Sequence, residues 1–166
     1  MRRERGASTL EFTLVGIPLI FGLISTVEMA RGMWIYQTQT YAVHQGVRYA
    51  VVHGYDCTQN GNTCTMTVGN IANVLANAGV GLVTSQWDVT LVSASGSNNV
   101  TCNPLSSCLS NNTVWPPSPD NTVGSSVGIN ATYPFASGIS MFYPGTKPIL
   151  FGTVNLPAYS KQVIQF

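Results

Sequence analysis

Nonpolar residues form one unbroken stretch near the start of the chain, and this stretch predicts a membrane-spanning helix. No charged residue occurs in residues 12–27. Counted from Ala7, the stretch has 21 residues, which at about 1.5 Å per residue make a helix of roughly 31 Å, close to the hydrocarbon core of a bilayer. Pro18 removes one backbone donor and is expected to kink this helix, which membrane helices tolerate. We therefore assign residues 7–27 to a transmembrane helix.

Beyond this stretch, nonpolar residues recur at alternating spacings of four and three, which is typical of one face of an amphipathic helix. The positions on this face are Met29, Met33, Tyr36, Thr40, Val43, Val47 and Ala50. Gln37, Gln39, Gln45 and Arg48 fall off it. Gly54 is a typical helix stop. We expect one continuous helix over about residues 9–53, whose outer part, residues 28–54, extends beyond the membrane and packs on a globular domain.

The remaining residues, 55–166, carry shorter patterns that predict a small domain outside the membrane. The expected elements are a helix over residues 67–79 and strands over residues 86–94, 125–135 and 152–163. The last strand contains Pro157, which favours a sheet edge. Residues 95–119 are rich in Ser, Asn and Pro and predict an irregular loop, and the apolar residues 136–151 predict a short helix or a hydrophobic flap. The expected fold class is α+β, with the long helix packed on a small antiparallel sheet.

Composition and charge place this domain outside the cytoplasm. Charged residues make up 8% of the 166 residues, against roughly 25% in an ordinary soluble domain. The formal net charge is +1, which argues against a nucleic-acid partner and against a cytosolic enzyme. Arg2, Arg3 and Arg5 precede the apolar stretch. This basic flank predicts a cytoplasmic N-terminus and a C-terminal domain on the other side of the membrane.

Glu11 is unexpected, because it lies near the start of the apolar stretch. A carboxylate costs about 2.5–3.5 kcal/mol at the centre of a bilayer and less near its edge. A secretory signal peptide would need a small-x-small cleavage site after its apolar core, and the residues that follow offer no convincing one. A plain single-pass anchor explains the length of the helix but not Glu11. A processed pilin-like N-terminus explains both.

The motif combines an arginine-rich leader with Gly6, Ala7, Ser8, Glu11, Phe12 and Pro18, and Glu28 and Arg31 mark its far end. Over about the first 50 residues, the sequence resembles the TadE-like family, small pilin-like proteins of the tight-adherence (Flp) pilus system. The sister TadF-like proteins begin similarly. The resemblance implies that a prepilin peptidase at the bacterial inner membrane cleaves after Gly6, leaving residues 1–6 as a cytoplasmic leader.

The resemblance also suggests a role for Glu11. Cleavage after Gly6 would create an α-amino group on Ala7 that is positively charged at neutral pH. Ala7 and Glu11 are four residues apart and share one helix face. In pilin assemblies such a glutamate pairs with the terminal amine of a neighbouring subunit, and pairing makes both charges tolerable in hydrocarbon. The alternative is that Glu11 only reaches toward the lipid headgroups.

The resemblance therefore implies a minor pilin-like structural or assembly protein, anchored once in the inner membrane with its C-terminal domain in the periplasm. Its expected partners are the membrane, the prepilin peptidase, other pilus subunits and the assembly machinery, with no nucleic acid and no small-molecule substrate. The alternative is a membrane-anchored binding module or enzyme outside the cytoplasm that is unrelated to pili. Gly6 and Glu11 favour the pilus interpretation.

All four cysteines lie in the domain expected outside the membrane, as two pairs that each flank a short segment rich in turn-forming residues. Four cysteines allow three pairings, and we favour the two local ones, Cys57 with Cys64 and Cys102 with Cys108. Disulfides fit an oxidising compartment, which agrees with the topology expected from the arginines. Free thiols are an alternative, and the spacings are longer than is usual for a structural zinc site.

The sequence indicates no catalytic or cofactor site. His44 and His53 are nine residues apart on or near the long helix, with no acidic cluster beside them. Asp56, Asp88 and Asp120 are scattered and make no carboxylate pair. We therefore expect no enzyme activity, no cofactor and no metal.

Overall fold

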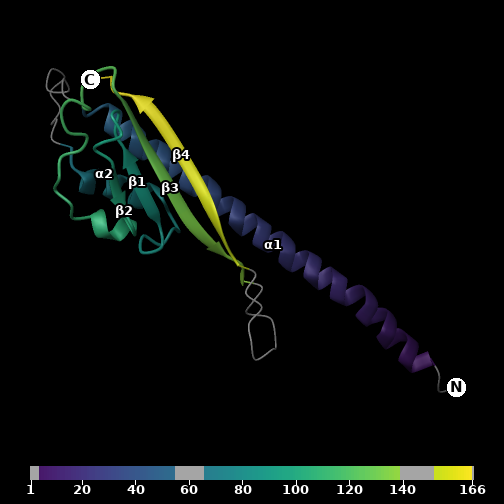
Figure 1. Ribbon diagram of the computed structural model, residues 1–166. Helices are drawn as coiled ribbons and strands as arrows, with labels where there is room; N and C mark the ends of the chain where they lie inside the picture. The colour runs from purple at the N-terminus through teal and green to yellow at the C-terminus, as the bar shows by residue number, and fades with distance from the viewer. Residues whose placement is uncertain (1–3, 55–65, 139–151, 166) are drawn as a thin grey trace. The chain divides into compact units, whose positions relative to one another are not determined.

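A computed structural model describes residues 4–54, 66–138 and 152–165 of the chain (Figure 1). The chain divides into two compact units. The first unit comprises Met1–Trp34 and Ala136–Gly152, and the second comprises Ile35–Phe135 and Thr153–Phe166. The elements in chain order are α1 (Glu4–Val51), α2 (Val68–Ala78), β1 (Asp88–Val92), β2 (Val100–Cys102), the 3-10 helix η2 (Leu105–Cys108), β3 (Ser126–Ala136) and β4 (Thr153–Val163).

The long helix α1 has 48 residues and confirms that the apolar and the amphipathic stretches form one element. It begins at Glu4, about five residues earlier than the sequence pattern indicates. Its first turn contains Gly6, a poor helix former, but also Glu, Arg and Ala, which are good helix formers. An acidic residue at a helix N-terminus is also favoured by the helix dipole. The helix ends at Val51, three residues before Gly54.

The four strands form one sheet in the order β2-β1-β3-β4. β1 pairs antiparallel with both β2 and β3, and its central residues lie opposite partners in both strands, as in the pairs Val89↔Cys102 and Val89↔Ala131. β4 lies at the edge of the sheet, as its Pro157 favours. The α+β class is confirmed.

The expected irregular loop over residues 95–119 is wrong in part, because it contains β2 and η2. β2 has only three residues, too few for a periodic pattern to be visible. It exists because β1 offers it a free edge, at Thr90↔Thr101 and the two flanking pairs. The expected helix or flap over residues 136–151 lies mostly outside the described residues.

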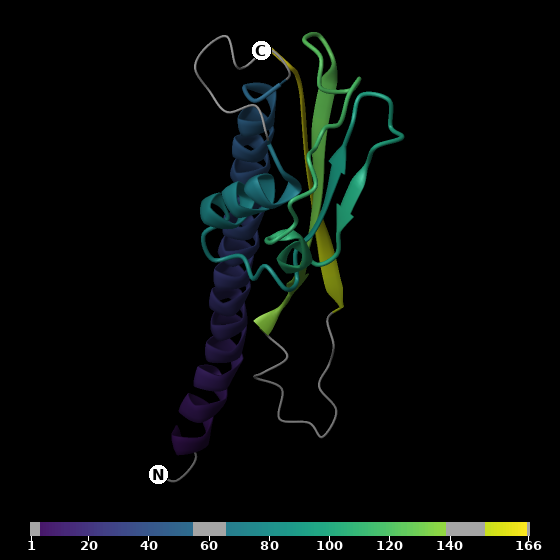
Figure 2. The same ribbon diagram turned by 90° about the vertical axis from the view of Figure 1, so that its left-hand side faces the viewer.

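The core of the second unit forms between the sheet and the helices, and Figure 2 shows α2 and the outer half of α1 on one side of the sheet. Trp87, Val89 and Leu91 are at most 1% exposed, as the alternation in this strand indicates. The alternate residues of β3 are also buried, namely Val127, Ile129, Ala131 and Tyr133. Gly46 lets α1 approach closely, because a Cβ there would lie 2.9 Å from side-chain atoms of both Leu75 and Ile129.

The predicted core face of α1 is correct only at its outer end. Val43, Val47 and Ala50 are buried, but Met29 is 75% exposed and Met33 55%. Gln39, expected off this face, is fully buried. Spacing along the sequence reveals the nonpolar face of a helix. Whether that face is buried depends on which other elements of the fold pack against it.

Candidate membrane and assembly segment

The N-terminal part of α1 exposes nonpolar side chains around its whole circumference. Ten large nonpolar residues here are 55–77% exposed, namely Leu10, Phe12, Leu14, Val15, Ile17, Leu19, Ile20, Phe21, Leu23 and Val27. Within Leu10–Val51, an 18-residue window reaches a mean hydropathy of 1.9, and none of that window is buried. Long apolar helices in soluble proteins are buried in a core, so this helix needs lipid or other helices around it. Its length and composition suit a membrane span.

The hydroxyl groups of this segment are satisfied within the helix itself. Each donates to a backbone carbonyl three or four residues earlier, so none needs water. The bonds are Thr13 Oγ1 to Leu10 O (2.9 Å), Ser25 Oγ to Phe21 O (2.8 Å) and Thr26 Oγ1 to Gly22 O (2.9 Å). The segment therefore presents little unsatisfied polarity to a surrounding bilayer.

The residues of the predicted processing and assembly motif lie on the first turns of α1. Gly6 and Ala7 have helical backbone, and Glu11 follows Ala7 by about one turn on the same face. Glu11 is exposed, and Phe12 is 77% exposed with its ring over Gly16. The helical assignment continues on both sides of Pro18.

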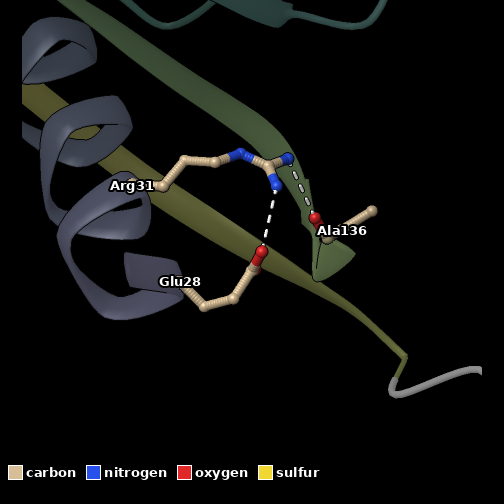
Figure 3. Close-up of polar contacts among 3 residues, drawn as sticks. All are labelled: Glu28, Arg31 and Ala136. Carbon is tan, nitrogen blue, oxygen red and sulfur yellow. Dashed lines mark hydrogen bonds and ion pairs between the residues drawn. The ribbon is translucent and has the colours of Figure 1, made fainter. Parts of the chain in front are cut away.

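At the far end of the apolar segment, Glu28 and Arg31 form an ion pair one turn apart (Figure 3). Arg31 Nη1 lies 3.4 Å from Glu28 Oε1, and Arg31 Nη2 donates to the carbonyl oxygen of Ala136 at 3.1 Å. The Glu28 side chain is 17% exposed, and its buried Oε2 has no hydrogen-bond partner within the part of the chain that the structure describes. Gly138 also lies close, since a Cβ there would be 2.8 Å from Glu28 Oε1.

The sequence marked Glu28 and Arg31 as the far end of the motif but did not indicate their contact with Ala136. Arg31 and Ala136 are separated by 105 residues. The acceptor is a backbone carbonyl, which every residue has, so the pattern of side chains cannot indicate it. Only the folded chain reveals this contact.

In the second unit, Cys102 and Cys108 form a disulfide with a Cα–Cα distance of 5.6 Å. They stand at the ends of β2 and η2, and both are buried. These two cysteines therefore form the local pair that their short spacing predicts. Cys57 and Cys64 lie outside the described residues, and their pairing stays a prediction.

Each of the two histidines has a polar contact, His44 with a residue of β4 and His53 within the end of α1. His44 Nδ1 lies 3.0 Å from Ser160 Oγ, and His53 Nδ1 lies 2.8 Å from the carbonyl oxygen of Tyr49. Across residues 4–54, 66–138 and 152–165, no group of three or more His, Cys, Asp or Glu side chains could hold a metal ion. Asp56 lies outside these ranges.

Asp120 is the centre of a small polar network. Its Oδ2 accepts hydrogen bonds from Ser95 Oγ at 2.6 Å and from Asn98 Nδ2 at 3.0 Å, and its Oδ1 accepts one from the Ser95 backbone N–H. The Ser95 and Asn98 side-chain hydrogen bonds, which favour the ionised carboxylate, lower the pKa of Asp120 below its ordinary value. The network ties the loop after β1 to the segment before β3 and is structural.

The exposed apolar helix and the α+β fold fit a single-pass membrane protein. A family model described as TadE-like protein matches residues 6–48, which begin at the predicted cleavage glycine and end within α1. The chain therefore carries a TadE-like domain, and the resemblance seen in the sequence is confirmed. This domain supports a protein associated with the tight-adherence pilus. No curated protein and no solved structure matches the chain.

Proposed function

We propose that this protein is a minor pilin-like structural or assembly protein of a tight-adherence pilus, processed by a prepilin peptidase between Gly6 and Ala7. The observation that carries the proposal is the TadE-like match over an apolar helix whose membrane-length window stays unburied among the residues that the structure describes. Such a helix can lie in lipid before assembly and against the helices of other subunits afterwards. Its partners are the inner membrane, the peptidase and the other pilus components.

The proposed topology has the N-terminus in the cytoplasm and the α+β domain in the periplasm. The arginines before α1 favour this orientation. The disulfide between Cys102 and Cys108 is consistent with it, because disulfides persist in oxidising compartments. The arginines precede the apolar helix in the chain and the disulfide follows it, and both favour the same direction of insertion.

Glu11 is the proposed assembly residue. After processing, the new amine of Ala7 and the Glu11 carboxylate of a neighbouring subunit would form a pair near the cytoplasmic edge of the membrane. Within one chain, the exposed position of Glu11 leaves its carboxylate accessible to such a neighbour. Phe12, also exposed, would pack beside this contact.

Processing is tested by sequencing the N-terminus of the mature protein from the native host. A start at Ala7 supports the proposal, and a start at Met1 or beyond residue 30 contradicts it. Gly6→Leu should block cleavage. Gly22→Leu is the matched control, because a side chain at Gly22 meets nothing within 4 Å, and this variant should be cleaved normally.

Assembly is tested by substituting Glu11 and measuring crosslinking or co-purification with pilus components, with processing followed in the same samples. Glu11→Leu should be inserted and cleaved but should lose association, since it leaves a partner's amine unpaired at a loss of about 1–3 kcal/mol per contact. Glu11→Gln should be intermediate and Glu11→Lys worst. The control is Thr13→Val, because the Thr13 hydroxyl is already satisfied by Leu10 O. Normal assembly of processed Glu11→Leu would contradict the pairing.

A further inference from the structure

The uncharged part of the apolar helix is too short to cross a bilayer by itself. Residues 12–27 number 16, which at 1.5 Å per residue make about 24 Å, whereas the hydrocarbon core is about 30 Å thick. About four more residues must enter the core. They come from the Glu11 end or from the turn that carries Glu28 and Arg31.

The outer turn can enter at low cost because its charges are paired within the chain. Glu28 and Arg31 carry opposite charges 3.4 Å apart, and the second arginine nitrogen donates to the Ala136 carbonyl (Figure 3). Pairing lowers the penalty for charged groups near hydrocarbon. Arg31 also has a long aliphatic stem that can lie along apolar surroundings. At the inner end, Glu11 is the only charged residue in residues 10–27, and the amine proposed to pair with it would come from a neighbouring subunit after processing.

The side chains beside this ion pair are suited to the boundary of a membrane. Met29 is 75% exposed, Met33 55% and Trp34 63%. Exposed nonpolar residues thus continue for about two turns beyond the predicted end of the span at Val27. Trp is enriched where hydrocarbon meets lipid headgroups, because its ring is apolar and its N–H is polar.

We propose that the outer boundary of the hydrocarbon core lies at Arg31, with Trp34 in the headgroup layer. The last residue of β3 and the two residues after it, Ala136 to Gly138, then lie at the membrane surface. Residues 12–31 number 20 and span about 30 Å, the thickness of the core. Trp34 then lies about 4.5 Å beyond it, within a headgroup layer roughly 5–7 Å thick. The inference rests on the proposed membrane anchorage and moves the predicted span of residues 7–27 outward by about one turn.

Tryptophan fluorescence tests the boundary directly. Trp87 and Trp115 are at most 1% exposed, so collisional quenchers act mainly on Trp34, and a Trp34→Phe variant supplies the background. The full chain is reconstituted in phosphatidylethanolamine–phosphatidylglycerol vesicles that contain a lipid spin-labelled either near the glycerol or near the end of the acyl chain. The shallow label should quench Trp34 more than the deep label, and aqueous iodide should quench it weakly.

A boundary at Val27 would place Trp34 about 10 Å outside the core, and strong iodide quenching without lipid quenching would overturn the inference. Vesicle flotation separates this failure from failure of the proposed function. A protein that does not float with the vesicles contradicts membrane anchorage itself. A protein that floats with Trp34 open to iodide contradicts the boundary alone.

Charge variants test the role of the ion pair in setting the depth. Arg31→Gln leaves the Glu28 carboxylate uncompensated, so the turn should move toward water and quenching by the shallow label should fall. The double variant Glu28→Gln with Arg31→Gln is neutral again and should regain that quenching. Arg48→Gln, an exposed residue in the last turn of the same helix, is the control and should change nothing. Equal quenching in Arg31→Gln and in the unmodified protein would overturn the role assigned to the pair.

Discussion

Replacing Gln39 by methionine should stabilise the second unit. Gln39 is on α1 within the second unit and is 0% exposed, and among the described residues neither its Oε1 nor its Nε2 has a hydrogen-bond partner. A buried polar group without a partner costs about 1–3 kcal/mol, because it has lost water and gained nothing in return. Methionine has a similar length, is unbranched, and matches glutamine in helix propensity. We therefore expect the free energy of unfolding to rise by about 1–3 kcal/mol in Gln39→Met.

Gln37→Met is the matched control, because Gln37 lies two residues earlier on the same helix and is exposed. A surface substitution of this kind changes stability by less than about 0.5 kcal/mol. Both variants are unfolded with guanidinium in detergent micelles, with the emission of Trp87 and Trp115 as the probe, since both side chains are buried in the second unit. Because both variants replace Gln by Met, the difference between their free energies of unfolding reports the effect of burying the side chain.

A fall in stability for Gln39→Met, or equal effects of the two substitutions, would refute the reasoning. Either result would mean that the Gln39 amide has a hydrogen-bond partner, such as an internal water, that compensates its burial.

Two other features of the second unit give testable expectations. Replacing both Cys102 and Cys108 by serine should lower the free energy of unfolding by about 2 kcal/mol, the loop-closure term for so short a loop, as measured by the same guanidinium titration. Asp120 has a lowered pKa in the folded state, so its ionised form stabilises the fold above its unfolded pKa, and that contribution is lost as pH falls through the folded pKa. Asp120→Asn should therefore be less stable than the unmodified protein at neutral pH, and the difference should shrink in acid, as unfolding measured against pH would show.

Most of the regular elements could be predicted from local patterns. β1 and β3 were visible because alternate residues, such as Trp87 and Ile129, are buried against the helices on one side of the sheet only. α2 was visible because its buried residues recur with helical spacing. β2 was not visible, because three residues carry no period and its existence depends on the free edge of β1.

The candidate site divides in the same way. Gly6, Glu11 and the apolar run of α1 could be found in the sequence because a membrane span and a processing motif are local features of composition and spacing. The contact between Arg31 and Ala136 could not be found, because it joins residues 105 apart and uses a backbone oxygen. It is this contact that suggests where the outer membrane boundary lies.

By itself, the sequence determined that the chain has one long helix with an apolar N-terminal part, a small α+β domain and a TadE-like motif, because each depends on residues that are neighbours along the chain. The tertiary structure decided which side of the outer helix is covered. It buried Gln39 and left Met29 and Met33 exposed, against the nonpolar line in the sequence. The physical reason is that burial depends on what packs against a residue, and the packing partners of α1 come from strands and a second helix far away in the chain.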